Sequence, residues 1–92
     1  MELKLYIAGQ SLRSRAAQAN LQRLLDAGHA DYSLSVIDVL EQPGEAEAAN
    51  IVAAPTLVKS SPPPVVRIVG DLSATAVVMR VLGMDPDDSE VR

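Results

Sequence analysis

The chain has 92 residues, enough for one small domain that buries roughly 60–65% of its unfolded surface. Hydrophobic residues make up 48%, but the two tyrosines are the only aromatic residues, so Leu, Val, Ile and Ala must build the core. Because the chain has no cysteine and one histidine, disulfides, thiol nucleophiles and multi-histidine metal sites are excluded. The 8 basic and 12 acidic residues give a net charge of −4, which is not the basic composition of a nucleic-acid-binding domain.

The sequence predicts neither a transmembrane helix nor a signal peptide. No apolar run approaches the ~20 residues that a transmembrane helix needs, and the N-terminus lacks the features of a signal peptide. We therefore expect a cytoplasmic protein without membrane contact. Residues 85–92 hold four acidic residues and one basic residue, so we expect a single domain over 1–84 and a disordered acidic tail over 85–92.

The first third of the chain has the pattern of a strand followed by a helix. Leu3–Ala8 carries apolar residues on both faces of a strand, and Gly9 ends it. Ser11 has the right chemistry to cap the helix that follows, and Gly28 supplies its C-terminal stop. The apolar face of this helix consists of Ala17, Leu21, Leu24 and Leu25.

A second strand is predicted over Leu34–Leu40. The segment is almost continuously apolar, as a strand covered on both faces would be. Since a helix connects it to the first strand, the two strands should be parallel. Proline is common at the first position of a helix, so Pro43 is a candidate start for the next one. The Ala- and Glu-rich composition of Glu45–Ile51 favours a short helix there.

The remaining elements are a hairpin and a helix. The segment Ala53–Leu57 leads into a short strand that ends near Lys59, and Ser60–Pro64 makes a stiff turn with three consecutive prolines. Val65–Val69 forms the fourth strand, so this pair should be antiparallel. Ser73 is expected to cap the last helix. The residues predicted to face the core along that helix are Ala74, Val77, Val78, Val81 and Leu82.

The order βαβ, α, ββα is typical of an α/β fold of the thioredoxin-like type, with helices on both faces of the sheet. Thioredoxin-like proteins carry a cis proline at the start of the third strand. Pro55 occupies that point here, so we expect the Ala54–Pro55 peptide bond to be cis.

The chemistry of a thioredoxin is missing. Ser11 and Ser14 have the spacing of its dithiol, but a serine hydroxyl neither carries electrons nor ionises at neutral pH. We interpret Ser11 as a helix cap.

The other candidate residues also have structural interpretations. His29 is predicted to lie in a solvated turn, and Asp38 either faces solvent or satisfies a nearby backbone group. Glutamates 41, 45 and 47 are interpreted as a solvated helix face, with a metal site as the alternative. No catalytic constellation emerges, so we expect a protein that is not an enzyme and needs no cofactor or metal.

Several sequence blocks nevertheless resemble a known family. They are Leu3–Gly9, Val36–Leu40, Ala54–Leu57, Pro62–Pro64 and Arg67–Ser73. In this order and at this spacing they resemble the KaiB family of small circadian-clock proteins, from about residue 3 to residue 83. The triple proline followed by Gly70-Asp71-Leu72-Ser73 is the most specific part.

The resemblance implies a regulatory binding role. KaiB-type proteins bind the N-terminal lobe of the KaiC ATPase ring and modulate its phosphorylation and ATPase cycle; in the cyanobacterial clock they then sequester KaiA and displace a histidine kinase. The family also implies two folds. The partner-binding state is monomeric and thioredoxin-like, whereas the free protein is a homo-oligomer, a tetramer or dimer, whose C-terminal half beyond about residue 50 is rearranged. Val77, Val78 and Val81 favour a strand almost as readily as a helix, which suits such ambivalence.

The family's partner surface implies four candidate contact residues. Basic side chains near the proline turn correspond to Lys59 and Arg67, whose alternative interpretation is an ordinary solvated edge. A lysine of the second helix corresponds to Asn50, and Arg15 lies next to the basic position of the first helix. A second basic residue, usual just before Arg67, is Val66 in this chain.

These departures keep other functions open. One alternative is a KaiB-like adaptor in stress signalling, and another is the interaction domain of a sensor kinase, each without a clock role. A remote alternative is a thioredoxin-like enzyme. The strand Leu34–Leu40 is either an edge that a partner strand could extend or buried by its own fold.

Overall fold

The computed structural model describes residues 1–28 and 31–83. The proposed tail over 85–92 and His29 lie outside these ranges. The elements are β1 (Glu2–Ile7), α1 (Leu12–Ala27), β2 (Ser33–Asp38), α2 (Pro43–Ala48), β3 (Thr56–Ser61), β4 (Val66–Val69) and α3 (Thr75–Val81). This is the predicted order of strands and helices.

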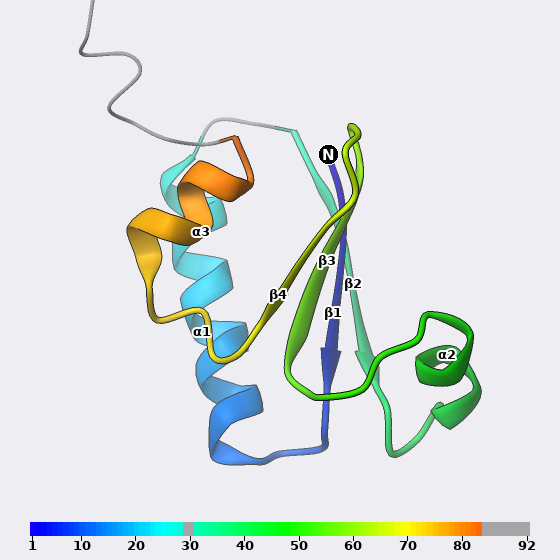
Figure 1. Ribbon diagram of the computed structural model, residues 1–92. Coiled ribbons are helices and arrows are strands. Elements are labelled where there is room, and N and C mark those ends of the chain that lie inside the picture. Colours follow the sequence, from blue (N-terminus) through cyan, green and yellow to red (C-terminus); the bar gives the residue numbers. More distant parts are fainter. Residues whose placement is uncertain (29–30, 84–92) are drawn as a thin grey trace, which may run out of the picture.

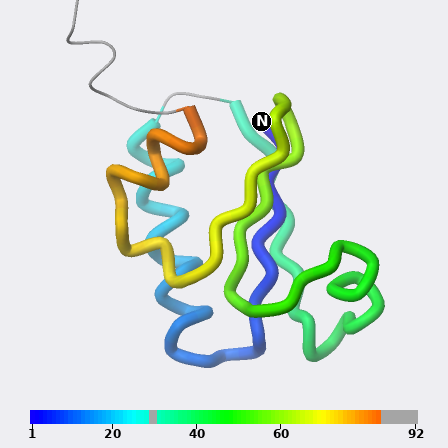
Figure 2. Tube along the Cα trace, in the orientation of Figure 1, coloured from blue at the N-terminus to red at the C-terminus, as the bar shows by residue number. Residues whose placement is uncertain are grey.

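The four strands form one mixed sheet with the order β2-β1-β3-β4. As predicted, β1 is parallel to β2, and β3 and β4 form an antiparallel hairpin. In the register, Leu5 of β1 lies between Val36 of β2 and Leu57 of β3. The N-terminus therefore lies beside the turn that joins β3 to β4 (Figure 2), where Glu2 is opposite Ser61.

The main core lies between the sheet and the helices α1 and α3, which cover the same face (Figure 1). Because side chains alternate along a strand, Leu3, Leu5 and Ile7 all point to this face. Each fully buried leucine stabilises the fold by about 1.5–3 kcal/mol relative to an exposed one. The other buried members are Ala17, Leu21, Leu24, Leu25, Leu57, Leu72, Val78 and Leu82.

A smaller core lies on the opposite face. Tyr6, Ile37 and Val58 form it, and Ala49 and Ile51, which follow α2, pack against it. Helix α2 thus stands apart from α1 and α3, beside the C-terminal ends of β1 and β2 (Figure 1). The predicted placement of helices on both faces is correct, and the smaller core is what connects α2 to the sheet.

Strand β2 differs from its prediction. It ends at Asp38 rather than Leu40 and forms an edge of the sheet, with Val36 44% exposed. Of the two alternatives left open for this segment, the structure confirms the edge strand and not the one buried on both faces. A run of apolar residues does not distinguish a central strand from an edge strand, because the neighbours of a strand are set by the topology.

The two later helices also differ from their predictions. Helix α2 begins at Pro43 as expected but ends at Ala48, and Asn50 then adopts a left-handed conformation with φ 56°. Helix α3 has Ala74 as its N-cap, so Ser73 is not the cap. Val77 is 52% exposed, and of the residues predicted to face the core, Val78 and Leu82 are buried. Within residues 1–28 and 31–83, no helix has both the length and the apolar character that crossing a bilayer requires.

Candidate functional site

The serine pair at the start of α1 is part of the backbone framework. Ser11 is the N-cap, and its hydroxyl accepts a hydrogen bond from the backbone N–H of Ser14 at 3.2 Å, which confirms the predicted cap. The Ser14 hydroxyl, whose residue is 0% exposed, accepts from the backbone N–H of Ala8 at 2.9 Å. Both hydroxyl oxygens thus stabilise the β1–α1 connection.

Asp38 fixes the same connection from the neighbouring strand. Its Oδ1 accepts hydrogen bonds from the backbone N–H groups of Gly9, at 3.1 Å, and Leu40, at 2.9 Å. Of the two interpretations left open for Asp38, the structure supports the one in which it satisfies backbone groups. Gly9 has φ +58°, and a Cβ added there would lie 3.2 Å from the Leu40 side chain, so glycine suits this close approach.

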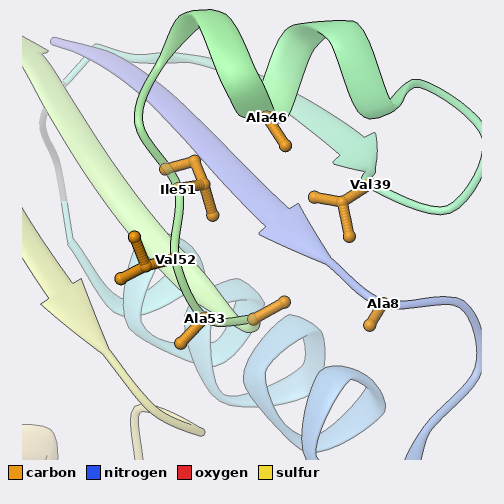
Figure 3. Close-up of a pocket in the computed structure, with 7 residues that line it drawn as sticks. Ala8, Val39, Ala46, Ile51, Val52 and Ala53 are labelled. Atoms are coloured by element: carbon orange, nitrogen blue, oxygen red, sulfur yellow. The ribbon is translucent and has the colours of Figure 1, made fainter.

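An apolar pocket of about 260 Å³ opens between α2 and the segment that leads into β3 (Figure 3). It is small beside the roughly 300–1,000 Å³ of typical small-molecule sites, and no lining residue carries a polar side chain. Such a pocket suits an aliphatic side chain of a partner protein better than a cofactor. The residues that line it are Ala8, Val39, Ala46, Ile51, Val52, Ala53 and Ala54.

Two hydrogen bonds anchor the segment after the pocket. Pro55 is buried, and the Ala54–Pro55 peptide bond is cis, as are Ser61–Pro62 and Pro63–Pro64. The hydroxyl of Thr56 donates to the carbonyl of Ala53 at 2.7 Å, and the backbone N–H of Gly70 donates to the carbonyl of Pro55 at 2.9 Å. By contrast, Val52 is 95% exposed, so an apolar side chain stands at the mouth of a pocket whose far end is fixed.

Two of the four predicted contact residues lie together. The guanidinium of Arg67, on β4, donates from Nη1 to the carbonyl of Asn50 at 3.2 Å and from Nη2 to the carbonyl of Ala49 at 2.5 Å. Arg67 thereby joins the fourth strand to the residues that follow α2, next to the pocket. The contact with Asn50 involves its main chain, so the amide side chain of Asn50 is not required for it.

The other two predicted residues lie elsewhere. Lys59 is 5% exposed, and its ammonium group donates to the carbonyls of Pro62 at 2.6 Å and Pro64 at 3.3 Å. Its interpretation as a solvated edge residue is therefore wrong. Arg15 is an exposed residue of α1, which covers the face opposite α2. The structure does not gather the four residues into one surface, and their role as partner contacts stays a prediction.

Reasoning from the sequence missed the pocket itself. Its lining comes from four separate stretches of chain, and small apolar residues carry no chemical signature. One available signal was the run of small residues Ala53-Ala54 before Pro55, because small side chains leave space beside a rigid turn. Among the residues that the structure describes, no group of His, Asp or Glu side chains could hold a metal ion.

The fold and the site define a class. This is a domain with a thioredoxin-like fold, in which the hydroxyl oxygens of Ser11 and Ser14 accept backbone hydrogen bonds and an apolar pocket lies nearby. One solved structure that shares this fold is mitochondrial thioredoxin 3 from Saccharomyces cerevisiae, with a TM-score of 0.72 and 23% identity; the match covers 89% of this chain and 76% of the thioredoxin. Another is the N-terminal domain of SasA from Synechococcus elongatus, with a TM-score of 0.70 and 24% identity; the match covers 90% of this chain and 80% of the SasA domain.

The particular family follows from the sequence comparisons. The KaiB domain model matches residues 4–84. The chain is 46% identical over 91 residues to circadian clock protein KaiB3 of Synechocystis sp., covering 98% of this chain and 89% of the relative. It is 48% identical over 84 residues to circadian clock oscillator protein KaiB of Synechococcus sp., covering 90% and 74%. The chain therefore belongs to the KaiB family, a family of clock regulatory proteins.

Proposed function

We propose that this chain is a non-catalytic regulator in a circadian or other timing system, which binds a KaiC-type ATPase ring and modulates its phosphorylation and ATPase cycle in the cytoplasm. The observation that carries the proposal is the 46% identity to a named clock protein over 98% of the chain, because it spans every element around the pocket. The backbone roles of Ser11 and Ser14 support the absence of catalysis, since their hydroxyl oxygens serve the fold.

The apolar pocket is the proposed contact site for the ring. Val52 stands almost fully in water, and covering one valine side chain contributes roughly 1.5 kcal/mol or more of hydrophobic free energy. Arg67 and Asn50 lie beside the pocket. Lys59 would have to leave two carbonyl partners before it could reach another protein, so we place the contact on the α2 side of the sheet.

We further propose that binding selects between two folds. The fold described here is the binding state, and the free chain is a homo-oligomer with a rearranged C-terminal half. The β-branched residues of Val65–Val69 and Val77–Val81 support this, because their local preference does not decide between helix and strand. The apparent affinity for the ring is then lowered by the rarity of the binding state.

The test is co-elution with the KaiC-type ATPase of the same organism, in ATP and in ADP, after an incubation long enough for slow refolding. Val52→Asp places a charge at the mouth of the pocket and should abolish co-elution. Val77→Asp is the matched control: Val77 is also exposed, belongs to α3 on the opposite face, and lies in the first helical turn, where a carboxylate is favoured. It should co-elute at least as strongly as the wild type, because a carboxylate in this turn favours the helix of the binding state.

Each result of this test has a defined meaning. Nucleotide-dependent co-elution that Val52→Asp abolishes and Val77→Asp preserves supports both the ring and the pocket. Co-elution of both variants keeps the ring as partner but removes the pocket from the interface. Absence of co-elution for the wild type in either nucleotide contradicts the proposed function and favours the adaptor role in stress signalling.

A further inference from the structure

Arg67 forms a bridge between two elements that the chain order separates. It lies in β4 opposite Val58 of β3, and its guanidinium reaches the carbonyls of Ala49 and Asn50, at the C-terminal end of α2. The last carbonyls of a helix have no partner within the helix, and a cation is favoured at that end. Hydrogen bonds from a charged donor are also stronger than neutral ones. Arg67 therefore tethers the C-terminal end of α2 to strand β4 of the sheet.

The tethered residues lead directly into the wall of the apolar pocket. After Asn50, the segment Ile51–Ala54 lines the pocket and ends at Pro55. The far end of this wall is held by the bond from Gly70 to the Pro55 carbonyl. The near end is held by Arg67 and by the Ile51 N–H, which donates to the carbonyl of Ala46 at 2.8 Å.

The two carbonyls that Arg67 binds belong to adjacent residues. A guanidinium presents two nitrogen donors in a fixed plane and can meet both oxygens at once, as it does here with Nη1 and Nη2. A lysine ammonium at the same position would keep the charge but lose this fork. Substitution of Arg67 by lysine therefore tests the two-pronged hydrogen bonding of the guanidinium separately from its positive charge.

We propose that Arg67 is a positioning residue for the pocket: it holds the wall formed by Ile51–Ala54 in place and acts on partner binding through that wall rather than by contacting the partner. The effect on binding rests on the proposed function, whereas the effect on the wall is a property of the thioredoxin-like fold and needs no partner. A residue that contacts the partner directly would leave the wall unchanged in the free protein and would contribute a salt-dependent part of the affinity.

The first measurement is amide hydrogen exchange in the full-length chain, read by NMR from the assigned resonances of the thioredoxin-like conformer and not from those of a rearranged one. Arg67→Gln should accelerate exchange of the Asn50 and Ile51 amides about ten-fold, Arg67→Lys should give a smaller acceleration, and the Gly70 amide should be unchanged. Lys4→Gln is the charge-matched control, because Lys4 is exposed and lies on the α2 face of β1, outside the pocket lining. It should exchange like the wild type.

The second measurement is the affinity of the same variants for the ATPase ring at two salt concentrations. Arg67→Gln should weaken binding about ten-fold, Arg67→Lys less, and neither should change the salt dependence. Unchanged exchange at Asn50 and Ile51 overturns the positioning role whatever the affinity. Faster exchange with wild-type affinity also overturns it, because the wall would then not matter to the partner.

The proposed function can fail separately. If the wild type does not bind the ring, the proposed function and the binding effect of Arg67 are both contradicted, while the exchange rates still decide whether Arg67 holds the wall. Should Arg67→Gln fail to fold by circular dichroism, Arg67→Lys carries both measurements, since it keeps the positive charge on β4.

Discussion

Lys59 and Arg67 project from opposite faces of the sheet, although both flank the same proline turn. In the β3–β4 hairpin Lys59 pairs with Val66 and Arg67 pairs with Val58, so the two side chains are out of phase. Lys59 shares the face of Leu3, under α1 and α3, whereas Arg67 shares the face of α2. Two basic residues that look like one charged patch in the sequence therefore hold two different loops.

The role of Lys59 predicts a stability defect before any binding defect. Lys59→Met keeps the buried aliphatic stem but removes the donor to the Pro62 and Pro64 carbonyls, and should lower the free energy of unfolding by about 1–2 kcal/mol. Lys59→Glu should cost more, since a carboxylate would face two carbonyl oxygens in a buried position. Urea unfolding measures both; an unchanged midpoint for Lys59→Glu would contradict the structural role.

The serines at the start of α1 should behave as backbone acceptors. Ser14→Ala leaves the N–H of Ala8 without its partner in a buried position and should cost about 1–3 kcal/mol. Ser11→Ala removes the helix cap and should cost about 1 kcal/mol. Ser33→Ala, at an exposed residue of β2, serves as the control in the same thermal or urea unfolding series. Equal stability of Ser14→Ala and Ser33→Ala would refute this interpretation.

Asp38 should be replaceable by a residue that keeps one oxygen acceptor. Asp38→Ala removes the acceptor for the Gly9 and Leu40 N–H groups and should destabilise the fold by about 1–3 kcal/mol. Asp38→Asn retains a carbonyl oxygen and should recover most of that loss. The comparison of the two unfolding midpoints gives the answer, and an asparagine variant as unstable as the alanine variant would point to a role for the charge instead.

Asp71 predicts a specific acid sensitivity. Hydrogen bonds from the Ser73 hydroxyl and the Ser73 backbone N–H, the latter at 3.0 Å, lower the pKa of the Asp71 carboxyl, and nearby Arg13 adds to this. A carboxyl whose pKa is lower in the folded state stabilises the fold above its unfolded pKa, and this contribution disappears as the pH falls through the folded pKa. The wild type should therefore lose stability faster than Asp71→Asn below about pH 4.

An NMR titration checks the cause directly. Ser73→Ala should raise the pKa of Asp71 toward the ordinary aspartate value, because the hydrogen bond from the Ser73 hydroxyl, the largest cause of the lowered pKa, is lost. Asp31, an exposed aspartate in a different part of the chain, provides the reference resonance. If the pKa of Asp71 does not move in Ser73→Ala, the hydroxyl is not what lowers it.

The parts of the fold that were predicted correctly depend on local signals. The strand–helix–strand order requires a parallel β1–β2 pair, the short proline turn requires an antiparallel hairpin, and the Ser11 cap follows from residue type at a helix start. The failures depend on tertiary position. Val36 and Val77 are as apolar as the residues of the core, and their exposure follows from an edge strand and from the rotation of a short helix.

For the candidate site, the sequence predicted the course of the main chain around Pro55 but not the pocket or the burial of Lys59. The position of Pro55 and its cis peptide bond followed from the element order. The resemblance singled out Arg67 as a partner contact, and that role stays a prediction although the structure places its guanidinium beside the pocket. The burial of Lys59 was not predictable, because the face on which a strand residue lies depends on the register with the neighbouring strands. The pocket depends on the spatial meeting of alanines and valines that have no individual signature.

The tethers made by Lys59 and Arg67 share one further property: both end on main-chain carbonyl oxygens. Every amino acid offers that acceptor, so the donors are constrained by these contacts while the side chains at residues 49 and 50 are not. Covariation analysis of related sequences would therefore detect no residue that coevolves with Lys59 or Arg67 through these contacts. At residue 50 the constraint is instead the left-handed backbone, which Asn, Asp and Gly adopt most readily. An exchange among these residue types changes what an approaching protein meets without altering the frame that presents it.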